Sequence, residues 1–142
     1  MGEDRLEYFG HVKISEIKIP DPQFTTPYEK ISTTELLMLR KKINGLPVVN
    51  NNKNRKVVGI ITQRNIRLAR FAVSLDSKYT TVKDLMTANP IIIKEDNSIK
   101  DALIKFFKFD IERLPVVNEN GELVGLVVEQ KILKKLLDYL NM

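Results

Sequence analysis

The sequence predicts a mixed α/β (α+β) fold made of two pseudo-symmetric copies, each with the order strand, helix, strand, strand, helix. The first observation is a phrase of five residues, Leu-Pro-Val-Val-Asn, which occurs at 46–50 and again at 114–118. The second is that the same offset, 114 − 46 = 68, pairs residues upstream of the phrase, among them Pro22 with Pro90. Self-similarity at a fixed offset indicates a structural repeat. Two copies are too few for a solenoid, so we expect them to pack sheet to sheet as one domain.

The residues before the first copy are expected to form a helix. Apolar residues recur in positions 4–17 at a loose helical spacing, although Gly10 weakens the pattern and Pro20 ends it. We assign residues 1–74 to the first copy together with this helix, and residues 75–142 to the second. Each copy alone would have a thin core, so both are expected to form a single module.

Each copy is predicted to open with a short strand and a helix. The expected strands lie at 23–26 in the first copy and at 91–94 in the second. The helix after each strand begins with a capping signal, a Ser followed three residues later by an acid, at 32–35 and 98–101. In such a box the two side chains bond to each other's backbone N–H groups at the start of the helix.

Two strands joined by a polar turn are expected next in each copy. They lie at 46–50 and 57–62 in the first copy, and at 114–118 and 123–128 in the second. The second turn contains Asn120-Gly121, which predicts a hairpin because both residues tolerate a positive φ. The first turn lacks Gly and is two residues longer.

A closing helix is expected at 65–73 in the first copy and at 131–140 in the second. Polar residues 74–81 connect the copies, and residues 81–84, Thr-Val-Lys-Asp, carry a further capping signal.

Composition limits the possible functions. There is no Cys, which excludes disulfides, thiolate metal sites and cysteine nucleophiles. His11 is the one histidine, and no histidine cluster, Walker-type phosphate loop or Ser/His/Asp set occurs, so catalysis is not expected. The start of the chain is polar and no apolar run approaches the roughly 18–20 residues that span a bilayer. We expect a cytoplasmic protein with no membrane partner.

The net charge of +5 is distributed unevenly along the chain. No acid occurs from Leu36 to Leu75, whereas nine basic residues do. They are Arg40, Lys41, Lys42, Lys53, Arg55, Lys56, Arg64, Arg67 and Arg70. Such a stretch favours anionic partners such as phosphate-bearing ligands or nucleic acid. A solvated basic face without a partner is the plainer alternative, and both stay open.

The chain resembles a tandem pair of cystathionine-β-synthase (CBS) domains, often called a Bateman module. The resemblance rests on Asp-Leu-Met-Thr at 84–87 with Pro90, on the repeated Leu-Pro-Val-Val-Asn, on the turn 59–65 and on the helix start 98–102. It covers about residues 12–140. It implies two small sheets, pseudo-twofold symmetry and a cleft between the repeats with two potential sites for adenosine-containing ligands.

In this family a strand-to-helix turn, Gly-x-x-Thr/Ser-x-x-Asp, holds the ribose. The first copy matches it with Gly59 and Thr62, and has Asn65 where Asp is usual. Asn offers one carbonyl acceptor where Asp offers two oxygens, so the resemblance implies a weakened ribose site that favours more phosphorylated nucleotides. Thr62 is equally well explained as the cap of the following helix.

The second copy departs further from the motif. It keeps Gly125 but has Val128 at the hydroxyl position and Lys131 at the carboxylate position. Val cannot hydrogen-bond and Lys only donates, so this turn cannot hold a ribose in the same way. Lys131 then faces phosphates or solvent.

The resemblance also implies that the adenine slot of the Thr62 site is built from the other copy. The implied residues are Pro90, Ile91, Ile92, Ile111, Arg113, Leu114 and Pro115. Arg113 matches a basic position that reaches phosphate in some members. Ile91, Ile92 and Ile111 are also expected in the core whether or not a ligand binds.

The leading interpretation is a regulatory sensor, not an enzyme, that binds AMP, ADP, ATP or S-adenosylmethionine and signals occupancy to an unknown protein partner. No cofactor is required. We expect a homodimer through the apolar helix faces at 106–109 and 136–140. Two alternatives remain: a basic nucleic-acid-associated protein on the same scaffold, and a structural dimerisation module whose sites have decayed.

Overall fold

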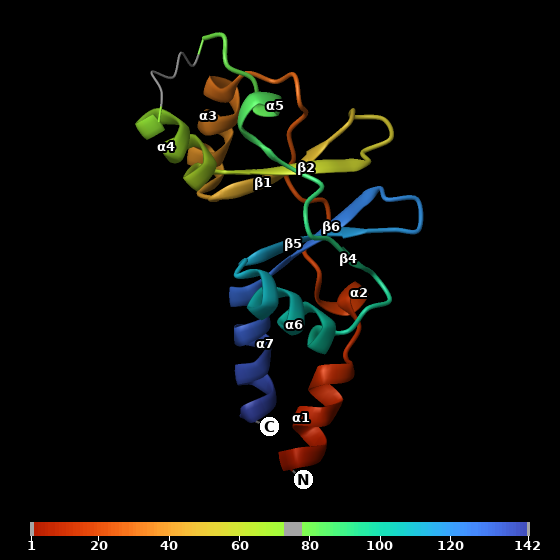
Figure 1. Cartoon of the computed structure of the whole chain (residues 1–142). Helices are drawn as coiled ribbons and strands as arrows, with labels where there is room; N and C mark the ends of the chain where they lie inside the picture. Colours follow the sequence, from red (N-terminus) through yellow and green to blue (C-terminus); the bar gives the residue numbers. More distant parts are fainter. Residues whose placement is uncertain (1, 73–77, 142) are drawn as a thin grey trace. The chain divides into compact units, whose positions relative to one another are not determined.

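The computed structural model describes residues 2–72 and 78–141, and it divides into two compact units (Figure 1). The central unit comprises Gln23–Pro90, and the terminal unit comprises Met1–Pro22 together with Ile91–Met142. Each unit has one three-stranded sheet with helices. The predicted mixed fold with two similar copies is therefore confirmed. In the part of the chain that the structure describes, no helix is long and apolar enough to cross a membrane.

The short segments around Ile14 and Val82, which precede the strands of the two copies, each belong to the compact unit that contains the other copy's strands. The predicted boundary after residue 74 therefore does not coincide with a boundary between compact units. Ile14 is fully buried in the terminal unit, and its N–H donates to the carbonyl of Asn97 (2.8 Å). Val82 is fully buried in the central unit, and its N–H donates to the carbonyl of Glu29 (2.9 Å). The repeat offset relates both pairs, since 82 − 14 = 68 and 97 − 29 = 68. The exchange is thus a property of the repeat itself.

The central unit places its sheet in the order β1–β2–β3 with antiparallel neighbours. Its elements are α3 (Ile31–Lys41), β1 (Gly45–Val49), β2 (Val57–Thr62), α4 (Gln63–Ala72), α5 (Val82–Leu85) and β3 (Thr87–Ala88). Pro47 of β1 lies opposite Ile60, and a register shift follows Val48. The buried core consists of Ile31, Met38, Leu46, Val48, Ile61, Ile66 and Val82.

The predicted first strand at 23–26 is wrong. Thr25 forms a single parallel bridge with Val48, and its hydroxyl is buried 3.2 Å from that of Thr34. Pro27 has no N–H, so it cannot extend the pairing beyond Thr25 as a ladder. The predicted strands 46–50 and 57–62 are confirmed to within one residue.

The predicted capping box is present at the start of the helix in the second copy and absent in the first. At α6 (Ile99–Phe109) the box is confirmed, because Ser98 Oγ accepts from the Asp101 N–H and Asp101 Oδ2 accepts from the Ser98 N–H. At α3 it is wrong, because the N-cap is Lys30, two residues before Ser32, and Lys30 makes no side-chain cap bond. Lys30 takes the repeat position of Ser98, since 98 − 30 = 68. The repeat geometry, and not the nearest Ser, sets the start of the helix.

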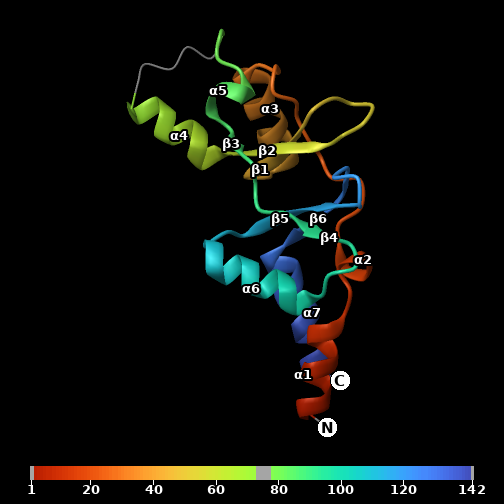
Figure 2. The same ribbon diagram turned by 45° about the vertical axis from the view of Figure 1, so that its right-hand side comes forward.

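The terminal unit has its sheet in the order β4–β5–β6, parallel between β4 and β5 and antiparallel between β5 and β6. Its elements are α1 (Gly2–His11), α2 (Ile14–Ile17), β4 (Ile93–Lys94), α6, β5 (Arg113–Val117), β6 (Leu123–Val128) and α7 (Glu129–Leu140). Its buried core consists of Phe9, Val12, Ile14, Ile93, Ile99, Ala102, Phe106, Leu114, Val116, Val127 and Ile132. Figure 2 shows α1 alongside α7.

The single helix predicted at 4–17 is in fact two. The chain leaves α1 at Val12, whose carbonyl accepts from the Ile99 N–H (2.9 Å), and α2 then begins at Ile14. The ring of Phe9 packs edge-on against Tyr139 of α7, with centroids 5.0 Å apart. These contacts hold the N-terminal residues on the terminal unit.

Candidate functional site

The turn between β2 and α4 holds the two polar residues of the predicted ribose site, and they bind each other. Thr62 ends β2, and both its N–H and its hydroxyl donate to Asn65 Oδ1, each at 2.9 Å. In return the Asn65 N–H donates to Thr62 Oγ1 at 3.1 Å. The pair caps the first turn of α4, so the capping role considered for Thr62 is present in this structure.

This mutual cap decides which groups the turn can offer to a ligand. The carbonyl oxygen of Asn65 already accepts two hydrogen bonds, which fills its two lone pairs. The Asn65 amide NH₂ and one lone pair of the Thr62 hydroxyl remain. The resemblance implied a weakened ribose site in which Asn65 offers one carbonyl acceptor, and in the structure that oxygen accepts from Thr62. The turn therefore offers mainly donors, next to the positive end of the α4 dipole.

Gly59 is required by packing within the central unit. A Cβ at Gly59 would lie 2.7 Å from Met86 Sδ and 2.9 Å from the carbonyl of Thr87, because β3 runs close beside β2. A Cβ at Gly125 would likewise lie 2.7 Å from Lys18 Cδ and 3.1 Å from the carbonyl of Ile19. At both positions a glycine leaves room for the exchanged segment that packs beside it. This close packing explains both glycines without a ligand.

The equivalent turn of the terminal unit has no polar clamp. Val128 is the N-cap of α7 and makes no side-chain cap bond, and Lys131 is exposed. The helix start is fixed by the backbone, through the Glu129 N–H to the Glu112 carbonyl (2.9 Å). The predicted difference between the two turns is thus visible in their hydrogen bonding.

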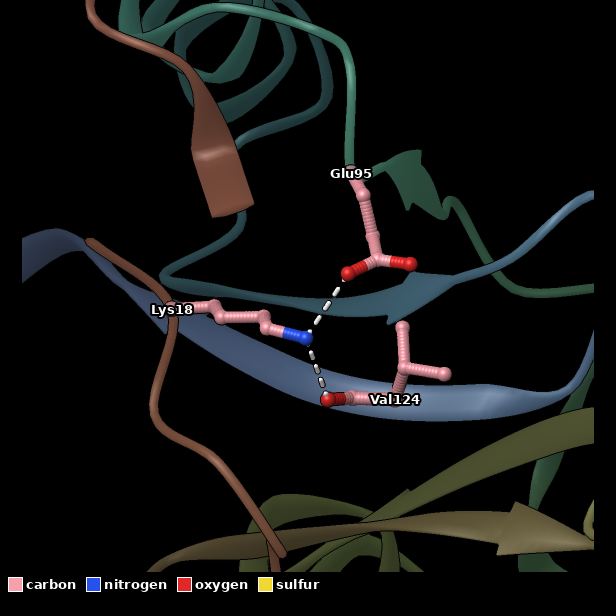
Figure 3. Close-up of polar contacts among 3 residues, drawn as sticks. All are labelled: Lys18, Glu95 and Val124. Carbon is pink, nitrogen blue, oxygen red and sulfur yellow. Dashed lines mark hydrogen bonds and ion pairs between the residues drawn. The ribbon is translucent and has the colours of Figure 1, made fainter. Parts of the chain in front are cut away.

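Lys18 makes polar contacts close to the equivalent turn of the terminal unit (Figure 3). The ribose-binding motif did not identify this residue. Its Nζ donates to Glu95 Oε2 at 2.8 Å and to the Val124 carbonyl at 3.1 Å, while its stem lies against Gly125. Met86 occupies the same repeat position in the central unit, since 86 − 18 = 68. With side chains 18% and 38% exposed, the ion pair contributes no more than about 1 kcal/mol.

The predicted adenine-slot residues of the terminal unit lie before β4 and around β5. Ile91 and Ile111 are half-buried and pack on its core, and Pro115 is buried opposite Leu126. The Ile92 carbonyl accepts from Lys105 Nζ at 2.5 Å, so this backbone acceptor is already engaged. Pro90 is half-buried at the end of the central unit, after Asn89, whose φ is +50°.

Arg113 begins β5 and is half-buried opposite Val128. Burial lowers the pKa of its guanidinium below the ordinary value, and the negative charge of Glu112 offsets part of this effect. An arginine starts from so high a pKa that it stays protonated near neutral pH. Arg113 therefore offers a fixed positive charge.

The predicted site residues are divided between the units. Gly59, Thr62, Asn65 and Pro90 belong to the central unit, and the others to the terminal unit. Sequence reasoning missed Lys18 and Lys105, although both showed a signal. At both positions the other copy has an apolar residue: Met86 corresponds to Lys18, and Leu37 corresponds to Lys105. Among the residues that the structure describes, no group of three or more His, Cys, Asp or Glu could hold a metal ion.

A separate hollow of about 630 Å³ lies between α1 and α7. It is lined by Asp4, Arg5, Tyr8, Lys135, Asp138 and Tyr139. None of the predicted site residues lines it.

Comparison with known proteins identifies the family. The family model of the CBS domain matches the chain twice, at residues 14–71 and 82–138. Inosine-5'-monophosphate dehydrogenase of Methanocaldococcus jannaschii is 33% identical over 123 residues, which is 87% of this chain and 23% of that enzyme. The chain spans about a quarter of the length of the curated relatives it matches.

Two solved structures are similar over most of the chain. CBSX2 in complex with AMP has a TM-score of 0.79 and 25% identity, covering 89% of this chain and 97% of that one. The CBS domain pair of protein MJ0100, in complex with 5'-methylthioadenosine and S-adenosyl-L-methionine, has a TM-score of 0.73 and 26% identity, with 89% and 97% covered. The chain belongs to the CBS domain family and contains a tandem pair of CBS domains.

Proposed function

We propose that this CBS pair is a regulatory module that binds one adenosine-containing ligand per chain and signals its occupancy to a protein partner. The candidate ligands are AMP, ADP, ATP and S-adenosylmethionine. Two similar structures contain ligands of this class, AMP in one and S-adenosyl-L-methionine with 5'-methylthioadenosine in the other. The observation that carries the proposal is the Thr62–Asn65 pair, a polar turn that only the central unit retains.

The chemistry of this turn favours a ligand that presents acceptors. The Asn65 NH₂ can donate to a ribose oxygen or to a phosphate, and the Thr62 hydroxyl oxygen can accept from a ribose hydroxyl. Asn in place of Asp also removes a negative charge beside the N-terminus of α4. The proposal therefore ranks nucleotides with more phosphates above adenosine.

The remaining site assignments belong to the same proposal. Ile91, Ile92 and Ile111 supply apolar surface for the adenine face, and Pro90 and Pro115 are assigned to the same site. The fixed charge of Arg113 attracts phosphate, and exposed Lys131 adds a weaker, screened attraction.

We further propose that the module works as a cytoplasmic homodimer without catalytic activity. Several large apolar side chains of α6 and α7 are exposed, and patches of this kind mark interfaces. They include Leu103, Ile104, Phe107, Phe109, Leu133, Leu137 and Leu140. Phe106 and Leu136, which we had grouped with this face, pack on the core instead.

Calorimetric titration with AMP, ADP, ATP and S-adenosylmethionine tests the proposal. We expect one binding site per chain for at least one of these ligands, and a lower affinity for that ligand in the Thr62→Val variant. The competing function is a dimerisation module with decayed sites, which the mutual cap of Thr62 and Asn65 favours because it gives both residues a structural role without a ligand. No heat of binding with any of the four, together with no small molecule released from the purified protein in mass spectrometry, would support that function.

A further inference from the structure

The turn that joins β1 to β2 projects beyond the sheet of the central unit (Figures 1 and 2). Its residues, 50–56, are all exposed and read Asn-Asn-Asn-Lys-Asn-Arg-Lys. Three of them, Lys53, Arg55 and Lys56, are basic, and none is acidic or apolar. We call residues 50–56 the basic turn.

Asparagine side chains, and not the cations, fix the shape of the basic turn. Asn50 Oδ1 accepts from the N–H groups of residues 51 and 56, at 2.8 and 2.9 Å. Asn51 Oδ1 accepts from the N–H groups of residues 53 and 54, at 2.9 and 2.7 Å. Within the part of the chain that the structure describes, the Nζ atoms of Lys53 and Lys56 make no hydrogen bond or ion pair. Both ammonium groups are therefore available to a partner.

The equivalent turn of the terminal unit shows that this shape does not require positive charge. There Asn118 Oδ1 accepts from the N–H groups of Asn120 (2.9 Å) and Glu122 (3.0 Å). That turn, residues 118–122, contains two acids, Glu119 and Glu122, and no cation. The cations of the basic turn thus belong to the first copy alone and call for an explanation other than folding.

Arg55 differs from the two lysines because its guanidinium is held in place. The guanidinium carbon lies 4.8 Å from the centre of the half-buried ring of Phe24, and Nε donates to the carbonyl of Asn52 at 3.2 Å. No hydrogen bond or ion pair of its two Nη atoms is present among the described residues. A guanidinium presents its N–H groups as a planar fork that matches two oxygens of a phosphate or carboxylate. Arg55 is therefore positioned in advance for an oxyanion.

The composition of the turn decides the class of partner. Protein interfaces depend on a few buried aromatic or apolar anchors, and the basic turn has none. Attraction to an anionic bilayer is typical of clusters of about four to eight cations, more than this turn carries. Single-stranded nucleic acid is held by stacking of bases on aromatic rings, whereas the ring of Phe24 is already in contact with Arg55.

Duplex DNA meets these requirements. Its backbone presents closely spaced oxyanions, and its major groove admits a two-stranded β-ribbon such as β1–β2 with its turn. The exposed asparagine amides can also bond to base edges, since an amide matches the edge of adenine. We propose that the basic turn binds the phosphate backbone of duplex DNA, with the β1–β2 ribbon directed into the major groove. This assignment does not depend on the proposed adenosine ligand.

The test measures binding of the full chain to a fluorescein-labelled DNA duplex of about two helical turns by anisotropy, between 50 and 200 mM salt. Three phosphate contacts predict a slope of about −2.7 for the logarithm of affinity against that of salt, which is about a fortyfold fall over this range. Lys53→Gln with Lys56→Gln removes two contacts, so the slope is expected to become shallower by about 1.8. Arg55→Lys keeps the charge but loses the fork, so affinity is expected to fall about fivefold at an unchanged slope.

A matched control comes from the terminal unit, where Lys134 and Lys135 form an exposed basic pair on α7. Lys134→Gln with Lys135→Gln removes the same charge from the chain, and is expected to change the slope by less than about 0.5 because the basic turn is intact. The melting temperature of each variant, all of them at exposed positions, checks that it remains folded.

Four results would overturn the proposal. One is no binding of the duplex by wild type at 50 mM salt. Another is an equal change of slope in the Lys134 and Lys135 control, which would mean general attraction to a basic protein. A third is a wild-type slope in Lys53→Gln with Lys56→Gln. The last is tighter binding to single-stranded DNA, to polyglutamate or to phosphatidylserine vesicles than to the duplex.

Discussion

Replacing Asn65 with Asp separates the ligand role of the β2–α4 turn from its capping role. In the structure Asn65 Oδ1 accepts from the Thr62 N–H and hydroxyl, and the NH₂ takes no part in these bonds. An Asp can keep both bonds with one oxygen and place its second oxygen where the NH₂ was. The change therefore preserves the cap and converts the NH₂ donor into a charged acceptor.

The expected magnitudes follow from this exchange. A ribose hydroxyl that donates to the new oxygen gains a charge-assisted hydrogen bond of about 1–2 kcal/mol, or roughly a five- to thirty-fold gain in affinity for adenosine. For ATP the gain is expected to shrink, because the carboxylate repels nearby phosphates. An acid in the first turn of α4 should also raise the free energy of unfolding by about 0.3–1 kcal/mol.

The assay is isothermal titration with adenosine and ATP on wild type, Asn65→Asp and Thr62→Val, with the melting temperature of each. Thr62→Val removes the hydroxyl that both donates to and accepts from Asn65, so it should lower stability by about 1 kcal/mol and weaken every adenosine ligand. The reasoning fails if both variants change in stability while their affinity for adenosine stays at the wild-type value. Thr62 and Asn65 would then only cap α4.

Three further predictions test the packing and the assembly. Lys30→Ser supplies the side-chain cap that α3 lacks, and is expected to raise the free energy of unfolding by about 0.5–1 kcal/mol in urea denaturation; no gain would show that the cap geometry is unsuitable. Gly59→Ala is expected to lower the free energy of unfolding by about 1–3 kcal/mol, and by more than Gly125→Ala does. A Cβ at Gly59 would lie 2.9 Å from a backbone carbonyl oxygen, whereas a Cβ at Gly125 would lie 3.1 Å from one; equal melting temperatures of the two variants would contradict this prediction. Phe107→Asp with Leu137→Asp is expected to give a mass near 16.4 kDa in light scattering, against a dimer for wild type; a wild-type mass of 16.4 kDa would refute the dimer.

Much of the fold was predictable because each copy repeats the same apolar pattern. The strands β2 and β6 match the predicted 57–62 and 123–128 at both ends. Both are bounded by a polar turn on one side and a helix on the other. The capping boxes at Ser98 and Thr81 match the spacing of an acid three residues later, a spacing that Ser32 and Glu35 share without forming a box.

The exchange of the preceding segments was not predictable from local patterns. It depends on which core buries Ile14 and Val82, and this is decided by contacts between residues more than fifty positions apart. Lys18 pairs with Glu95 across 77 residues, so no local motif could connect them. In contrast, the Thr62–Asn65 cap joins residues three apart, which is why sequence reasoning already included it.

Amide chemical-shift mapping of the ¹⁵N-labelled chain with saturating AMP or ATP tests most directly whether a ligand contacts the β2–α4 turn. The signals of the Thr62 amide and the Asn65 side-chain NH₂ are expected to shift strongly, because the ligand contacts that turn. The amide signals of Val128 and Lys131 are expected to stay in place, because the equivalent turn of the terminal unit has no polar clamp. Unchanged signals at Thr62 and Asn65, or equal shifts at both turns, would contradict this expectation.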